Sequence, residues 1–167
     1  MSASAPVTLS REEGSHIWYT GGLLTIKAGS EHTGGQYSLV EELLPPGMST
    51  PYHIHRNEDE TFYLIEGEAE FIIEGTVQLA KAGAFLFLPR NIPHGFRVTG
   101  KHPARMLNMV NPAGLERFFI ELSQPAAELV IPPSAMPDIP KMIEVAKRYN
   151  IEILGPLEHF INGSELG

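Results

Sequence analysis

Short runs of hydrophobic and β-branched residues alternate with glycine- and proline-containing turns over about residues 17–111. Ten such runs predict strands at Ile17–Tyr19, Leu23–Lys27, Gln36–Leu43, Tyr52–His55, Glu60–Ile65, Ala69–Glu74, Thr76–Leu79, Phe85–Leu88, Gly95–Val98 and Ala104–Val110. Many short strands with regular glycine and proline punctuation favour an all-β sandwich or barrel.

The spacing of hydrophobic residues changes from strand-like to helical after Pro112. A helical stripe with the spacing i, i+3, i+4 and i+7 is formed by Leu115, Phe118, Phe119 and Leu122. A second helix is predicted from about Ile139 to Tyr149, with Asp138 as its N-cap. Its expected inner stripe consists of Ile139, Met142, Ile143 and Ala146. We expect both apolar faces to cover the outer surface of the barrel. The prediction is therefore one domain over residues 1–167, with a barrel core at about 17–111 and a helical appendix at about 112–167.

Composition excludes several classes of protein and site. The 167 residues include 12 Lys+Arg and 20 Asp+Glu, so the net charge is −8 and no basic patch suggests a nucleic-acid partner. There is no cysteine, which excludes disulfides, thiolate metal sites and a cysteine nucleophile. No apolar run is long enough to span a membrane, and Met1–Ser10 shows no secretion signal. We therefore expect a cytoplasmic protein without a membrane partner.

One segment, Gly47–Gly67, places candidate metal ligands on neighbouring strands. His53 and His55 are two residues apart in an extended run, so they share one face with Cα atoms roughly 7 Å apart. This spacing suits two imidazoles around one metal ion. Glu60 opens the next run on its inward face, whereas the preceding Glu58–Asp59 pair is expected to form a solvated turn.

A fourth candidate ligand comes from the distant segment Gly83–Phe96. In it a short apolar strand meets a proline-bounded turn, and His94 opens the following strand. Because 39 residues separate His94 from His55, the two can meet only through tertiary structure.

These two segments resemble the paired motifs of the cupin superfamily. The first matches G-x5-H-x-H-x4-E-x6-G at every fixed position. The second resembles G-x5-P-x-G-x2-H-x3-N but has Asn91 at a usual glycine and Val98 at a usual asparagine. Asparagine tolerates left-handed backbone, so the first departure is mild. The resemblance implies a small cupin-type β-barrel, a jelly-roll-like double-stranded β-helix with two C-terminal helices here, and a metal centre built by His53, His55, Glu60 and His94.

Outside the motifs, three segments are similar to single-domain quercetin 2,3-dioxygenase-like cupins: Leu24–Gly29, Gly114–Leu122 and Arg148–Pro156. This resemblance implies a metal-dependent dioxygenase that cleaves a flavonol such as quercetin, or a related enolisable aromatic, with O2 and releases carbon monoxide. Three imidazoles and one carboxylate suit divalent Ni, Co, Mn, Fe, Cu or Zn and leave coordination positions open for a small-molecule substrate. In this interpretation Glu60 is both ligand and general base.

Four residues are candidates for an apolar pocket around the metal: Phe62, Leu64, Phe96 and Met106. Such residues also fill the interior of any β-barrel. Two alternative functions share the same ligands, namely an acireductone-type oxygenase and a non-catalytic cupin that binds a small acid or sugar. Uptake of O2 discriminates an enzyme from a binding protein. We also expect a homodimer, because cupin barrels commonly pair through their outer strands.

Overall fold

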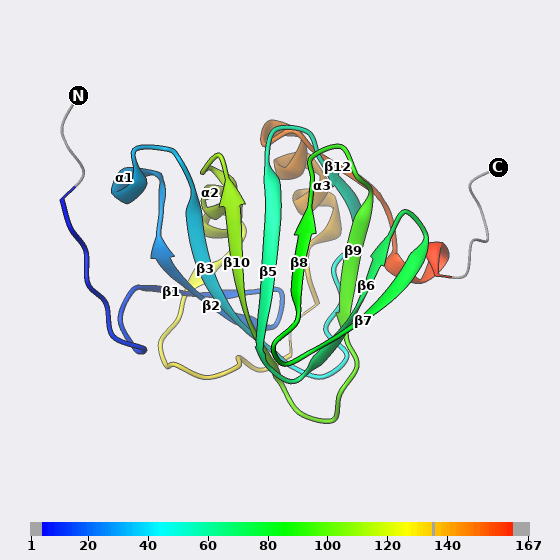
Figure 1. The fold of residues 1–167 in the computed structure, drawn as a ribbon, viewed down its shortest axis with the longest axis horizontal. Coiled ribbons are helices and arrows are strands. Elements are labelled where there is room, and N and C mark those ends of the chain that lie inside the picture. The colour runs from blue at the N-terminus through cyan, green and yellow to red at the C-terminus, as the bar shows by residue number, and fades with distance from the viewer. Residues whose placement is uncertain (1–4, 135, 162–167) are drawn as a thin grey trace.

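The computed structural model describes residues 5–134 and 136–161, and its strands form two antiparallel sheets (Figure 1). The first four residues of the segment Met1–Ser10 lie outside this description. The seven-stranded sheet has the order β11 (Gln124–Pro125), β1 (Ser15–Tyr19), β2 (Gly22–Ala28), β3 (Ser38–Leu44), β10 (Ala104–Asn111), β5 (Asp59–Glu66) and β8 (Phe85–Leu88). The five-stranded sheet has the order β12 (Ile151–Gly155), β4 (Tyr52–His55), β9 (His94–Val98), β6 (Glu68–Ile73) and β7 (Thr76–Lys81). The predicted all-β architecture is confirmed.

All ten strands predicted from the sequence are present, and β4 and β8 have the predicted bounds. The predicted alternation of β5 is also observed, because Glu60, Phe62 and Leu64 are buried whereas Tyr63 is exposed. Buried side chains from both sheets belong to one hydrophobic cluster, which includes Phe71 of β6. The candidate ligands therefore lie on inward faces of the two sheets.

Two strands were not predicted, and one of them supports the candidate site. Strand β12 pairs with β4 so that Ile151 lies opposite His55 and Ile153 lies opposite His53. The other, β11, has only two residues and pairs with β1. The C-terminal segment thus completes the sheet that carries two of the histidines.

Helices α2 (Leu115–Glu121) and α3 (Ile139–Arg148) confirm the two predicted C-terminal helices. The side chain of Asp138 accepts a hydrogen bond from the Lys141 backbone N–H at 3.0 Å, as expected of an N-cap. Two short elements were not predicted, α1 (Ser30–Thr33) and the 3-10 helix η1 (Leu157–Phe160).

The predicted position of the two helices is wrong. Their apolar residues do not cover the outer surface of the barrel, because Phe118, Phe119 and Met142 belong to the same hydrophobic cluster as the inward faces of the strands. The helices therefore close the interior of the barrel and form part of its core.

The predicted inner stripe of α3 is only half correct. Met142 and Ala146 are buried together with Val145, but Ile139 and Ile143 are 46% and 37% exposed. The helix is rotated so that its 142–145–146 edge faces the core, and the two isoleucines line a groove at its side.

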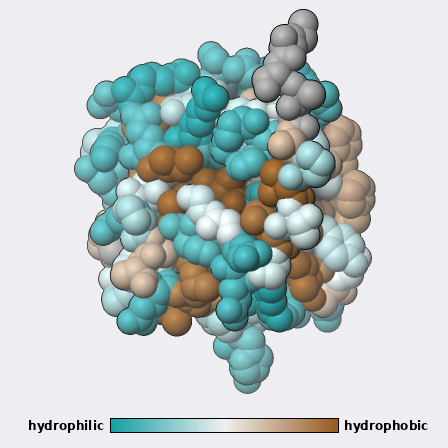
Figure 2. Space-filling view, turned by 90° about the vertical axis from the view of Figure 1, so that its left-hand side faces the viewer, coloured by the Kyte–Doolittle hydropathy of each residue, from teal (hydrophilic) through white to brown (hydrophobic). Residues whose placement is uncertain are grey.

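The face toward the N-terminal strands is largely hydrophilic, with hydrophobic patches at its centre and in its lower half (Figure 2). Scattered patches of this kind are normal for protein surfaces. Within the described ranges no helix is both long and apolar enough to cross a membrane.

Candidate metal centre

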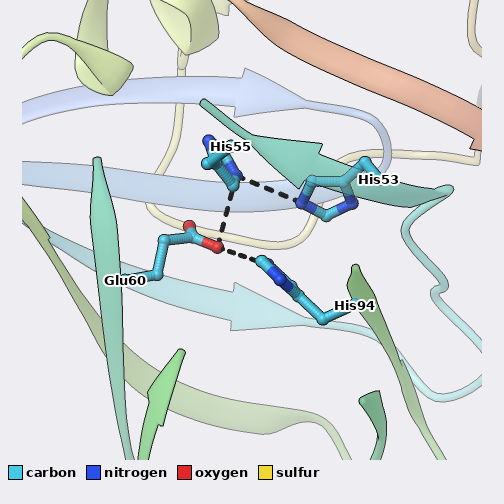
Figure 3. Close-up of side chains that lie close together, drawn as sticks. All are labelled: His53, His55, Glu60 and His94. Atoms are coloured by element: carbon cyan, nitrogen blue, oxygen red, sulfur yellow. Dashed lines mark hydrogen bonds and ion pairs between the residues drawn. The ribbon is translucent and has the colours of Figure 1, made fainter. Parts of the chain in front are cut away.

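The four candidate ligands converge from three strands, as Figure 3 shows. Strand β4 supplies His53 and His55 on one face, β5 supplies Glu60, and β9 supplies His94. The β4–β9 pairing sets His94 directly opposite His53. One potential ligand atom from each of the four residues lies within 4.8 Å of the others.

The atoms that face one another are the imidazole Nε2 atoms and one carboxylate oxygen. Nε2 of His53 lies 3.1 Å from Nε2 of His55. Oε2 of Glu60 lies 2.8 Å from Nε2 of His94 and 3.3 Å from Nε2 of His55. The cluster is therefore compact enough for one ion to contact all four residues.

The opposite nitrogen of each ring has its own partner. Nδ1 of His53 lies 2.7 Å from the Pro51 carbonyl oxygen, and Nδ1 of His94 lies 2.8 Å from that of Ile92. Nδ1 of His55 lies 2.8 Å from Oε1 of Glu58. Because all three partners are acceptors, each Nδ1 carries a proton, and a ring in its neutral form directs the Nε2 lone pair into the cluster.

Four acceptors that face one another at these distances repel unless a positive charge lies among them. In the metal-free protein that charge is a proton: burial lowers the pKa of His55, but Glu60 and Glu58 outweigh it and raise this pKa to about 10. Burial raises the pKa of Glu60, but His55 and His94 hold it well below its ordinary value. Burial, followed by the neighbouring histidines, lowers the pKa of His53 to about 3. The donor set fits a divalent metal ion, which would take the place of the proton.

The expectation of a solvated turn is wrong for Glu58. Its residue is only 6% exposed because the turn folds back, and its carboxylate accepts a hydrogen bond from His55. Asp59 points outward and accepts hydrogen bonds from the Arg90 backbone and guanidinium. The only sequence signal for Glu58 was its position three residues after a candidate ligand.

Two further polar residues at the site were missed in the sequence. Nδ2 of Asn108, on β10, donates to Oε1 of Glu60 at 3.1 Å and to Oε1 of Glu42, on β3, at 3.4 Å. Both Asn108 and Glu42 are buried. A polar residue at an inward position of an apolar strand was the available signal.

The cluster opens onto a chamber of about 80 Å³. Of the four pocket candidates, Phe62 and Phe96 line this chamber, whereas Leu64 and Met106 do not. Both of the latter are completely buried in the core, because residues farther along the inward face of β5 and β10 pack beneath the chamber. The remaining aromatic wall comes from Tyr19, Phe118 and Phe119.

A larger groove of about 710 Å³ adjoins the chamber. The two spaces share wall residues that include Tyr19, Met48 and Met142. Much of the outer wall is formed by the exposed isoleucines of α3 and by four residues before that helix, Ile131, Pro132, Ser134 and Pro137. A ligand larger than the chamber can extend into this groove.

Asn91, the departure in the second motif, has φ of 69° and so adopts the left-handed backbone expected at that turn. Its backbone N–H donates to the His55 carbonyl oxygen at 2.8 Å. The turn before His94 is thereby attached to the strand that carries His55.

Comparison with known proteins agrees with this geometry. A family model described as the cupin domain matches residues 40–110, a range that contains all four candidate ligands. The chain is 30% identical over 129 residues to quercetin 2,3-dioxygenase from Bacillus subtilis. That alignment covers 77% of this chain but only 38% of the relative, so the chain spans well under half the length of that protein.

Solved structures share the fold. KdgF from Halomonas sp. superposes with a TM-score of 0.59 at 17% identity, covering 68% of this chain and 98% of that one. A predicted oxalate decarboxylase from Thermotoga maritima gives a TM-score of 0.57 at 25% identity, covering 64% and 99% respectively. The two cupin motifs, the family model and the shared double-sheet fold together show that residues 40–110 form a cupin domain.

Proposed function

We propose that this protein is a metal-dependent dioxygenase that cleaves a flavonol such as quercetin, or a related enolisable aromatic, with O2. The observation that carries the proposal is the convergence of three Nε2 atoms and one carboxylate at the wall of an aromatic chamber. The similarity to the quercetin 2,3-dioxygenase of Bacillus subtilis supports it.

The residues that would hold the metal are His53, His55 and His94 through Nε2, and Glu60 through Oε2. A divalent Ni, Co, Mn, Fe or Cu ion at this site would supply the positive charge that stabilises a deprotonated substrate hydroxyl. Three neutral ligands and one carboxylate leave the centre cationic, which favours an enolate over a neutral alcohol.

Glu60 is the residue placed to remove the proton from the substrate. Its two oxygens have different surroundings, because Oε2 faces the imidazoles while Oε1 is held by Nδ2 of Asn108. Oε1 is therefore the oxygen at which the proton from the substrate hydroxyl would be accepted. Asn108 fixes the orientation of the carboxylate and so positions the base.

The rest of the chain would bind and orient the aromatic substrate. Five phenylalanine and tyrosine residues contribute to the chamber walls, and flat rings pack favourably against them. Since the chamber has room for only a small group, one ring of a flavonol would enter it and the remainder would extend past Met48 and Met142 into the groove.

The small volume of the chamber also favours a second candidate, an oxygenase of the acireductone type that acts on a small enediol. The ligand set is the same in both cases, so the substrate decides between them.

The Glu60→Gln variant tests the proposal, because it keeps the size and one coordinating oxygen but removes the basic carboxylate. We expect it to retain much of its metal and to lose flavonol turnover by roughly 10²-fold or more. Wild type, loaded in turn with Mn, Fe, Co, Ni and Cu, should consume O2 and release carbon monoxide. Glu66→Gln is the matched control, because Glu66 lies on the same strand with its side chain outside the chamber.

Two results would overturn the proposal. If no metal form of the wild type takes up O2 with any flavonol, the flavonol dioxygenase is excluded, and O2 uptake with a small enediol would then establish the second candidate. If Glu60→Gln turns over quercetin like Glu66→Gln, Glu60 is not the base.

A further inference from the structure

A second carboxyl group, which the proposed mechanism does not use, faces the chamber. Glu42 occupies an inward position of β3, where the flanking residues on the same face are Val40 and Leu44. Its residue is 5% exposed, and it lines the same chamber as the His/Glu cluster. A carboxyl group at such an apolar position costs folding free energy unless a partner compensates for the loss of water.

The partners available within the protein are few. Oε1 of Glu42 accepts one long hydrogen bond, 3.4 Å, from Nδ2 of Asn108, and that amide is shared with Glu60. Among the described residues no lysine or arginine forms an ion pair with Glu42. The side chain therefore has hydrogen-bonding capacity that the protein does not fill.

The surroundings of Glu42 favour its neutral form over its charged form. Burial, followed by the negative charge of Glu60, raises the pKa of Glu42 to about 8. A protonated carboxyl group can donate one hydrogen bond and accept another, as a phenolic hydroxyl does. Nδ2 of Asn108 donates to both Glu42 and Glu60, and both residues line the same chamber, where one bound ligand can meet them together.

We infer that Glu42 is a specificity-determining residue, which hydrogen-bonds a second hydroxyl group of the aromatic ligand held at the metal centre. The chamber then selects a polyhydroxylated ligand over one that carries only the metal-binding hydroxyl. This inference rests on the proposed function, because it takes the ligand to be a flavonol. A role confined to folding would not distinguish between two ligands that occupy the same chamber.

Binding of two flavonols to the metal-loaded protein under anaerobic conditions tests the inference, with the absorption spectrum of the flavonol as the readout. Quercetin has several hydroxyl groups, whereas 3-hydroxyflavone has only the metal-binding one. We expect wild type to prefer quercetin by roughly 10-fold, and Glu42→Met, which keeps the length but not the polarity, to lose this preference. Glu41→Gln is the matched control, because Glu41 is the adjacent residue and points away from the chamber to pair with Arg105.

The inference can also be tested by changing the ligand instead of the protein. In this version each hydroxyl of quercetin is methylated in turn, and binding to wild type is measured. We expect that one hydroxyl, in addition to the metal-binding one, is needed, and that its methylation weakens binding by a factor similar to the preference for quercetin. If Glu42→Met keeps both its metal and the wild-type preference, or if no such hydroxyl exists, the inference is overturned while the proposed function stands. If wild type binds neither flavonol, the proposed function fails and this inference fails with it.

Discussion

At the scale of single residues, the Nδ1 partners determine what the three histidines can do. Each ring donates from Nδ1 to a fixed acceptor, so its Nε2 lone pair is available to a metal ion without any change of tautomer. Two of these acceptors are backbone carbonyls, and only Glu58 is a side chain. Glu58 is therefore the one orienting partner that a substitution can test directly.

Replacing Glu58 with glutamine should weaken metal binding by roughly 10- to 100-fold, because a charged acceptor for the Nδ1–H of His55 is lost. Metal titration against a competing chelator measures this, with His53→Ala as the reference for loss of a ligand. Asp59→Asn is the matched control, because Asp59 is adjacent and contacts Arg90 on the surface. Equal affinity in Glu58→Gln and wild type would show that Glu58 does not support the site.

At the scale of secondary structure elements, the site depends on how closely β9 approaches the start of β4. Gly95, the residue after His94, has no room for a side chain. An added Cβ would lie 2.6 Å from Cδ1 of Leu157 and 2.9 Å from the Pro51 carbonyl oxygen. That carbonyl is the acceptor for Nδ1 of His53, so the packing at Gly95 and the orientation of a ligand are linked.

Gly95→Ala should therefore lower the free energy of unfolding by roughly 1–3 kcal/mol and also weaken metal binding. Chemical denaturation and metal titration give the two values. Gly100→Ala serves as the comparison, since its added methyl would meet the flexible Glu68 side chain first. If Gly95→Ala matches wild type in both measurements, the close approach is not required for the site.

At the scale of the whole molecule, the two sheets supply the ligands and the C-terminal segment encloses them. Strand β12 extends the sheet of β4, and helices α2 and α3 contribute wall residues to the chamber. As a result the ion would bind in a site with little water, where protons and metal compete for the same nitrogens.

This competition predicts how metal affinity depends on pH. Because the pKa of His55 is raised to about 10 in the metal-free protein, that ring is protonated at pH 7 and binding must release its proton. Apparent affinity should rise about tenfold per pH unit between roughly pH 7 and 9, and metal should be lost below roughly pH 6. Calorimetry in buffers of different ionisation enthalpy counts the released proton. An ion that stays fully bound at pH 4 during dialysis against chelator would argue against a histidine-rich site.

The local pattern of the sequence determined the strands, the helices and the candidate ligands. Period-two alternation placed Glu60 and Phe62 on the inward face of β5, and helical spacing located α2 and α3. These features follow from the local backbone geometry, which fixes how side-chain directions repeat along a strand or helix and which a pattern records directly. The two cupin motifs added His94 to the set, which spacing alone could not connect to His55.

Only the tertiary structure decided what surrounds those ligands. The burial of Glu58 depends on how the turn after His55 folds back. The Asn108 bridge to Glu42 and the closure of the chamber by α2 and α3 join segments that are far apart in sequence. An apolar helical face can cover either the outside or the interior of a barrel, and the pattern is the same in both cases. Packing between distant elements, which no local period encodes, makes that choice.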